Sequence, residues 1–498
     1  MIDNKYEIFY DTETTGPEPK FDQVLQYAAI RTDEDFEEID TVDIRSQMSP
    51  HMLPTPGALK VTHVDPYEIA RAPFTPYDYA RHVHGMLVNW LNDGPTDFSG
   101  WNIINYDEEI MRQMFWQSLQ DPYLSSGKGK RRVDYLLMAR AIYARNPNII
   151  EIPVNEETGK NNFKLENMAT KNGFEGHNAH DALGDVRATI HMARLIRDLD
   201  PHLFYHAKLM GQAQTAVQFV EDEKTFRILG GQMINPGILD VVHITDQSDN
   251  QKAKVAWNLA VDPTPFLDME PAEILKAMRK SGTPFRNVKC HKQPMIFPMG
   301  WEFKHHASGT EAPTPDLIDA RTNLVLENLE FQRNVQKAVD MKVEGYSPNV
   351  YLEEKIYSGF PDYRDKARMK DFHNASEWSR KLEISRTFEM KTLKELALRL
   401  VWANAPEVLS DTHRAAITKA VNETRFTMDV DDAPWTTLGS FMKELAEWEE
   451  KFPGDEELVN IRNWVEEFFP QVNGKVADET DAPDQTTGPD AHFLDGID

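Results

Sequence analysis

The first two hundred residues alternate short apolar runs with acidic turns. Residues 6–13, 24–32 and 37–46 (YEIFYDTE, VLQYAAIRT and EEIDTVDIRS) predict three successive β-strands. Apolar side chains then recur at three- and four-residue spacing in 107–119 and 180–199, which predicts amphipathic helices. Strands followed by helices and further short strands favour an α/β fold in which helices flank a mixed sheet.

The pattern changes after residue 200. Short apolar runs such as KVAWNLAV and QPMIFPMGW are bounded by Gly, Pro and Asp and predict a small β-rich domain, whereas 314–339 predicts a helix. Nearly every segment after Tyr351 has helical periodicity. After Gln471 the chain is acidic and almost without apolar residues, which is typical of disorder. We therefore expect an α/β domain (1–200), a β-rich domain (201–350), an all-α domain (351–470) and an acidic tail (471–498).

Charge limits the function of this chain. It has 81 acidic and 54 basic side chains, and the net charge of −27 disfavours general binding to polyanions. A nucleic-acid-binding function therefore requires local basic clusters, and two are present, Lys128–Arg132 and Lys366–Lys370. Taken alone, both runs are interpreted as solvent-exposed faces. The acidity fits a saline cytoplasm and a virus-encoded origin equally well.

The single cysteine, Cys290, excludes a disulfide framework and a multi-cysteine zinc site. No segment approaches the ~18–20 uninterrupted apolar residues of a membrane span. The first residues, MIDNKYEIFY, have neither the basic nor the apolar region of a signal peptide. These features predict a cytoplasmic protein with no membrane partner.

Two carboxylates follow the apolar run YEIFY. Asp11 and Glu13 are two residues apart, so on a strand both side chains project to one face. Adjacent anions repel each other unless a cation lies between them, and Mg²⁺ prefers hard oxygen ligands. By itself the D-x-E pattern is weak evidence in a chain with 81 acids, and the polar end of an edge strand explains it equally well.

Two later segments change this interpretation. Asp107 begins the predicted helix 107–119, where the helix dipole favours a carboxylate. In HNAHDALGDVRAT, His180 precedes Asp185 by five residues. A helix that begins near His180 would bring Asp185 to the metal site and leave the imidazole free to act as a general base on a bound water.

The order Asp-x-Glu, Asp, His-x4-Asp resembles the DEDDh 3′→5′ exonucleases. Within that superfamily, QYAAIRTD, DPYLSSG, FKLENMATKNGFEGHNAHDALGDVRATI, LAVDPTPFLDME and IYSGFPDYRDKARM are similar to stretches of the exodeoxyribonuclease I family. The similarity covers essentially residues 6–470. It implies an RNase H-like nuclease domain, an SH3-like β domain and a helical domain that together surround single-stranded DNA.

The resemblance also implies chemistry and partners. A member of this family removes 5′-mononucleotides from the 3′ end of single-stranded DNA, in DNA repair and recombination, with two Mg²⁺ ions that Mn²⁺ could replace. It would act as a monomer, with single-strand DNA-binding protein as a second partner. The positions that match metal ligands are Asp11, Glu13, Asp107 and Asp185, and His180 matches the catalytic base. The positions that match strand contacts are Glu13, Arg112, Tyr123, Arg140 and Lys164.

The chain departs from the family in three places. Lys164 replaces an arginine, which keeps the charge but loses the bidentate phosphate fork. The segment SSGKGKRRVD is more basic and lacks aromatic residues, so strand binding is expected to be more salt-sensitive. The acidic tail either aids solubility or competes with DNA. Two alternatives remain at this point: an exonuclease of the same chemistry that acts on RNA, and a non-catalytic single-strand DNA-binding protein.

Overall fold

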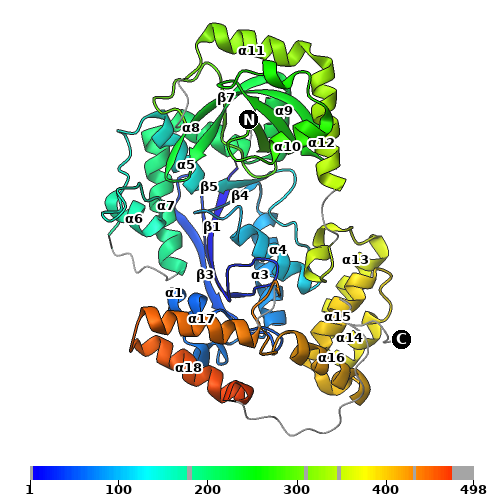
Figure 1. Cartoon of the computed structure of the whole chain (residues 1–498). Helices are drawn as coiled ribbons and strands as arrows, with labels where there is room; N and C mark the ends of the chain where they lie inside the picture. Colours follow the sequence, from blue (N-terminus) through cyan, green and yellow to red (C-terminus); the bar gives the residue numbers. More distant parts are fainter. Residues whose placement is uncertain (1–3, 176–181, 308–311, 345–348, 430–432, 474–498) are drawn as a thin grey trace.

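The computed structural model describes residues 4–175, 182–307, 312–344, 349–429 and 433–473. A five-stranded mixed sheet lies at the centre of the molecule (Figure 1). Its strands are β1 (Tyr6–Thr14), β2 (Val24–Thr32), β3 (Glu38–Arg45), β4 (Thr96–Gly100) and β5 (Lys130–Asp134). In the spatial order β3-β2-β1-β4-β5, β1, β2 and β3 pair antiparallel, while β4 pairs parallel to both β1 and β5. This arrangement confirms the predicted RNase H-like sheet.

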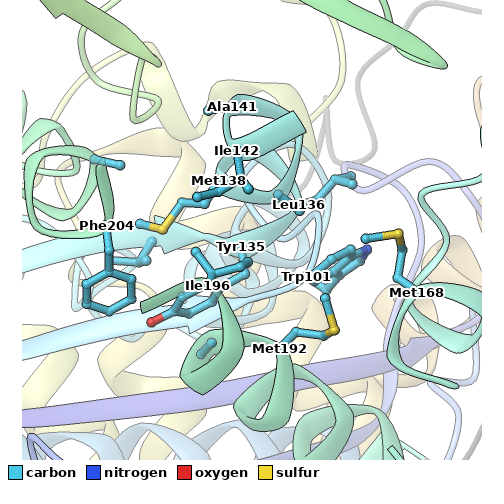
Figure 2. Packing of buried hydrophobic residues seen from close by; sticks show 14 of the residues in the cluster. Trp101, Tyr135, Leu136, Met138, Ala141, Ile142, Met168, Met192, Ile196 and Phe204 are labelled. Carbon is cyan, nitrogen blue, oxygen red and sulfur yellow. The ribbon is translucent and has the colours of Figure 1, made fainter. Parts of the chain in front are cut away.

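Both faces of this sheet are covered by helices, as the buried strands require. Ile8 and Tyr10 pack against α3 (Pro76–Asn92) and α4 (Asp107–Gln117). The alternate residue Phe9 packs on the opposite face, against a cluster formed by α5, α7 and α8. These helices span Tyr135–Arg145, Ala182–Leu199 and Pro201–Met210. In this second cluster the indole of Trp101 lies between Met168 and Met192 (Figure 2).

A second sheet, β10-β6-β7-β8-β9, is antiparallel throughout and confirms the predicted β-rich region. Its strands are β6 (Thr225–Gln232), β7 (Asn235–Gln247), β8 (Asn250–Asn258), β9 (Phe285–Lys289) and β10 (Ile296–Pro298). The predicted helix 314–339 is two helices, α11 (Pro315–Glu327) and α12 (Leu329–Glu344). The break occurs because Asn328 leaves the helical conformation (ψ 84°) and its side chain accepts a hydrogen bond from the Phe331 amide.

The C-terminal part is helical, as predicted. One group of helices packs beside α3 and α4, and Tyr77 and Trp116 of those helices join its apolar core (Figure 1). This group comprises α13 (Tyr363–Asn374), α14 (Trp378–Ser385), α15 (Lys391–Asn404) and α16 (Asp411–Thr424). A second pair, α17 (Leu438–Lys451) and α18 (Glu456–Phe468), packs against α1 (Pro56–Thr62) and α2 (Pro66–Ile69).

The remaining helices are short connectors around the two sheets. They are α6 (Leu165–Lys171), α9 (Ala213–Glu223) and α10 (Pro271–Met278), with short 3₁₀ turns at Thr264–Phe266, Glu353–Tyr357, Pro406–Val408 and Pro470–Asn473. Among the described residues, none of the helices combines the length and the apolar character needed to cross a membrane. The acidic tail from residue 474 onward lies outside the described residues.

The first basic run is a solvent-exposed face only in part, because Lys128 is exposed but the two arginines are not. Residues 130–134 form β5, and Arg131 and Arg132 are buried. Arg131 lies opposite Asp97 in the β4–β5 ladder and binds both carboxylate oxygens at 2.7 and 2.8 Å. Arg132 lies 3.5 Å from Glu108. Both guanidinium groups therefore balance buried carboxylates. The expectation that this run makes strand binding more salt-sensitive stays a prediction.

Candidate active site

The site is built on the C-terminal end of β1, the central strand of the first sheet. Asp11 and Glu13 both lie on β1, two residues apart, with Asp11 opposite Ala28 and Glu13 opposite Gln26 on β2. The ladder is interrupted between Glu13 and Thr14. Both carboxylates therefore project from one face at the point where the regular strand ends.

Asp185 reaches the same face from α7. It lies in the first turn of that helix, and α7 packs across β1 and β2. The carboxylates of Asp11, Glu13 and Asp185 each offer one oxygen, and these oxygens lie within 4.8 Å of one another. Carboxylates from the start of the chain and from α7 are thus brought into a single acidic cluster.

The fourth predicted ligand, Asp107, lies beside this cluster. It opens α4 with Glu108 and Glu109, so three carboxylates occupy the positive end of the helix dipole. The hydroxyl of Thr12, the residue between Asp11 and Glu13, donates a 2.6 Å hydrogen bond to Oδ1 of Asp107. This bond ties the start of α4 to the end of β1.

The electrostatics of this cluster favour a bound cation. Burial raises the pKa of Asp11 well above its ordinary value, and the charges of Asp107, Glu13 and Asp185 raise it further. Burial also raises the pKa of Asp107 to about 7, although the hydrogen bond from Thr12 lowers it. Crowded, partly buried carboxylates with only oxygen donors match a hard divalent cation such as Mg²⁺. The four residues present therefore fit the metal site implied by the sequence.

The predicted base, His180, lies outside the described residues. Its helix begins at Ala182, two residues after it, close to the predicted start.

Arg112, a predicted strand contact, lies in a salt-bridge cluster beside α4. Its Nη2 donates to Glu108 at 2.6 Å and to the Ser126 hydroxyl at 3.2 Å. Glu108 also accepts from Ser125. Burial would raise the pKa of Glu108, but Arg112 and then Arg132 lower it below its ordinary value. The sequence analysis missed Glu108, although its place next to Asp107 and four residues before Arg112 was a signal for a helical ion pair.

The other predicted strand contacts lie on three separate elements. Tyr123, on the loop after α4, has its ring 5.8 Å from the Arg112 guanidinium carbon. Arg140, on α5, lies over the Phe163 ring at 5.6 Å. Lys164 precedes α6, and its side chain is 75% exposed, with Glu166 at 3.9 Å. Lys164 thus presents a charge that solvent or a ligand can reach.

The second basic run lines a groove next to Tyr123. The groove has a volume of about 780 Å³ and lies between α3, the loop after α4, and α13. Tyr123 and Phe360 contribute aromatic rings whose centroids are 5.7 Å apart. Lys366 and Lys370 are exposed and line the groove as well. The prediction that these two lysines are exposed to solvent is confirmed, and the structure places them at the groove.

A further basic cluster was missed by the sequence analysis. We call it the β9–β10 basic loop, Lys289, His291 and Lys292. Lys292 donates a 3.1 Å hydrogen bond to Asn105, two residues before Asp107. Burial, Arg132 and Lys292 lower the pKa of His291 to about 4. In the sequence, only the short segment VKCHK indicated this basic cluster, and no local pattern indicated that it packs near the start of α4.

Comparison with known proteins agrees with this geometry. The family model "Exonuclease" matches residues 8–193, and "Exonuclease I C-terminal domain" matches residues 351–471, which together exceed half of the chain. Exodeoxyribonuclease I of Escherichia coli is 28% identical over 396 residues, covering 74% of this chain and 80% of that protein. The chain belongs to the exodeoxyribonuclease I family.

Solved structures of exonuclease I share the fold over nearly the whole chain. The E. coli enzyme in complex with a dT13 oligonucleotide has a TM-score of 0.77 and 25% identity, covering 94% of this chain and 100% of that chain. A structure of SSB/exonuclease I in complex with an inhibitor has the same TM-score at 23% identity, covering 94% of this chain and 100% of that chain. The shared fold thus extends through both sheets and the helical part.

Proposed function

We propose that this protein is a divalent-metal-dependent exodeoxyribonuclease that removes 5′-mononucleotides stepwise from the 3′ end of single-stranded DNA, in repair and recombination. The observation that carries the proposal is the convergence of Asp11, Glu13 and Asp185 within 4.8 Å, beside Asp107. Family membership and the relative bound to an oligonucleotide support the substrate class. The SSB/exonuclease I structure supports single-strand DNA-binding protein as a second partner.

The residues divide the chemistry among themselves. Asp11, Glu13, Asp107 and Asp185 would hold two Mg²⁺ ions, which supply charge stabilisation for the pentacovalent phosphate and its leaving oxygen when bound. We assign His180, five residues before Asp185, as the base that takes a proton from the attacking water. The water oxygen bonds to phosphorus, the bond from phosphorus to the 3′-oxygen breaks, and that oxygen is protonated. The products are a 5′-mononucleotide and a strand with a new 3′-hydroxyl.

We propose a path for the strand that begins at these carboxylates. Arg112 and the β9–β10 basic loop would contact phosphates near the cleaved bond, because Arg112 lies on α4, five residues after Asp107, and Lys292 of the loop binds Asn105 just before α4. Tyr123 and Phe360 would stack on bases further along, with Lys366 and Lys370 beside them. Arg140 and Lys164 would contact the strand on the α5–α6 side. Local basic and aromatic groups thus offset the net charge of −27.

End-labelled oligonucleotides test the reaction. With Mg²⁺, a 5′-labelled single strand is expected to give a ladder of shortening products, and a 3′-labelled strand is expected to release labelled mononucleotide at once. Asp185→Ala should remove both activities. Release from the 5′ end, or unchanged cleavage by Asp185→Ala, contradicts the proposal. An RNA of the same sequence, assayed in parallel, should be degraded more slowly. Tight binding without cleavage in Mg²⁺ or Mn²⁺ would instead indicate a non-catalytic binding protein.

Replacing Lys292 by Ala tests the strand path. We expect weaker oligonucleotide binding and a salt dependence, log Kd against log salt concentration, that is shallower by about 0.7, because one phosphate contact of a single strand is lost. The measurement is a fluorescence-anisotropy titration of a labelled oligonucleotide in Ca²⁺ or EDTA over a salt series. Lys280→Ala, an exposed lysine after α10, is the matched control. An unchanged slope for Lys292→Ala would show that the strand does not pass over this loop.

A further inference from the structure

Leu119 lies just beyond the C-terminus of α4 in the left-handed conformation (φ 60°) and is buried. Helices often end in this conformation, but usually on glycine, because a Cβ makes it unfavourable. The turn is closed by the Gln120 amide, which donates to the Phe115 carbonyl at 2.7 Å. The periodic pattern had put Leu119 on the apolar stripe of the helix. Its actual conformation instead reverses the chain and begins the loop 119–126, which runs back along α4.

His373, in the last turn of α13, holds the carbonyl of Leu119. Its Nε2 lies 2.8 Å from that oxygen, and its Nδ1 lies 2.9 Å from the Tyr77 hydroxyl on α3. A carbonyl only accepts, so Nε2 carries a hydrogen. Burial lowers the pKa of His373 to about 4, so the ring is neutral and its bare Nδ1 accepts from Tyr77. The His373 and Tyr77 rings are also stacked, 5.8 Å apart with 17° between their planes. One neutral imidazole therefore joins three elements that are distant in sequence.

Lys381 on α14 adds a further donor to this chain of hydrogen bonds. Its side chain is buried, and its ammonium donates to the Phe372 carbonyl and, at 3.3 Å, to the Tyr77 hydroxyl. The ammonium lies 5.0 to 5.5 Å from the centroids of three rings, those of Tyr77, Phe372 and Trp378. The Tyr77 oxygen thus accepts from Lys381 while its hydroxyl donates to the bare Nδ1 of His373.

The far end of loop 119–126 binds the groups that face the strand. Ser125 donates to Glu108, and Ser126 accepts from Arg112 at 3.2 Å. Earlier in the same loop, the Tyr123 ring lies beside the Arg112 guanidinium and against the Phe360 ring. The loop is thus fixed to the helical region at its start and to the strand-binding side chains at its end.

We infer that His373 is a positioning residue for strand binding: by fixing the start of loop 119–126, it sets the orientation of Arg112 and Tyr123. The inference rests on the proposed function, since it concerns the same strand. Docking of α13 and α14 against α3 then becomes a condition for tight binding, while the carboxylates on β1 and α7 lie outside this chain of contacts. Replacing a positioning residue such as His373 should change the KM for long strands and leave the rate of hydrolysis of a small substrate unaltered.

His373→Phe tests the inference, because phenylalanine keeps the ring against Tyr77 and removes both hydrogen bonds. The substrates are a 20-nucleotide single strand and the p-nitrophenyl ester of thymidine 5′-phosphate, which occupies the metal site alone. We expect the KM for the oligonucleotide to rise about tenfold, the effect of losing a buried hydrogen-bonded contact, with kcat within twofold. Hydrolysis of the ester should be unchanged. Tyr77→Phe, which removes only the hydroxyl, should raise the KM in the same direction by a smaller factor.

His413→Phe on α16 is the matched control and should leave both substrates unaffected. The inference is overturned if His373→Phe and Tyr77→Phe both keep the wild-type KM, or if both lose ester and oligonucleotide hydrolysis in parallel with a lower Tm, since that pattern indicates a purely structural role. Should His373→Phe fail to fold, the KM of Tyr77→Phe decides alone. A wild-type protein inactive on both substrates would refute the proposed function instead.

Discussion

An Asp107→Asn variant is expected to be more stable than the wild-type protein at pH 8 without metal, and at the same time nearly inactive. The activity should fall about 10³-fold, because a ligand's share of the charge stabilisation in the transition state is about 4 kcal/mol. The gain in the free energy of unfolding should be about 2–4 kcal/mol. Both effects follow from the burial of the Asp107 carboxyl at the start of α4, beside the acidic cluster.

The sign of the stability effect follows from the raised pKa. Asp107 has an ordinary pKa near 3.8 and a folded pKa of about 7, chiefly because it is buried. Between these values the folded protein keeps a proton that the unfolded chain releases, so stability falls as the pH rises from about 4 to 7. Asparagine has no charge to bury and keeps the acceptor oxygen for Thr12. Mg²⁺ offsets the same penalty in the wild-type protein, so it should raise the wild-type Tm more than the variant Tm.

Thermal unfolding at pH 5 and pH 8, each in EDTA and in Mg²⁺, measures these differences. Asp198→Asn, an exposed position in the last turn of α7, is the control and should change neither Tm nor activity. Equal Tm values for Asp107→Asn and wild type at pH 8 in EDTA would show that burial of the charged Asp107 carboxylate does not lower the free energy of unfolding. A variant that kept wild-type exonuclease activity would remove Asp107 from the metal site.

Lys208→Met is expected to destabilise the protein by about 3–5 kcal/mol, the usual cost of leaving a buried charge without its partner. The Lys208 ammonium lies 2.6 Å from Glu7 and 2.8 Å from Asp97, behind β1 and β4. Arg131 would still pair with Asp97, but Glu7 would lose its only cation recorded among the described residues. Burial raises the pKa of Asp97, but Lys208 and Arg131 lower it to a net value below the ordinary one, so the stability it confers is lost in acid.

Urea denaturation at pH 7 measures this effect. Adding Glu7→Gln to Lys208→Met should restore part of the lost free energy, since the uncompensated carboxylate is removed. Lys171→Met is the matched control, because that lysine is 56% exposed and lies 3.6 Å from Glu151, so its loss should cost at most about 1 kcal/mol. A small effect for Lys208→Met would indicate that water enters this network.

Local sequence patterns predicted the active-site elements well. The spacing of Asp11 and Glu13 sufficed to place both on one face of a strand, because side chains alternate along any β-strand. The position of Asp107 at a helix start followed from its apolar periodicity and the helix dipole. Asn328 shows the limit of this approach: periodicity continued across it, but its side chain capped a new helix.

Contacts between distant segments were beyond the reach of such patterns. The run KGKRR is uniformly basic in sequence, but two of its residues pair with different buried carboxylates. Arg131 pairs with Asp97 through the β4–β5 register, and Arg132 pairs with Glu108 on α4. Likewise, no local feature indicated that His373 would meet Leu119, 254 residues earlier. Such pairings depend on strand register and on helix docking, which are properties of the packed molecule.

By itself, the sequence determined the fold class, the carboxylates and their order, because these depend on residue type and on spacing within single elements. The tertiary structure decided which charges remain available. It brought Asp185 to β1, buried half of a basic run, and turned VKCHK and Lys366–Lys370 toward the face of α4 and its loop. The physical reason is that the electrostatic environment of a side chain is set by its neighbours in space, and only folding determines those neighbours.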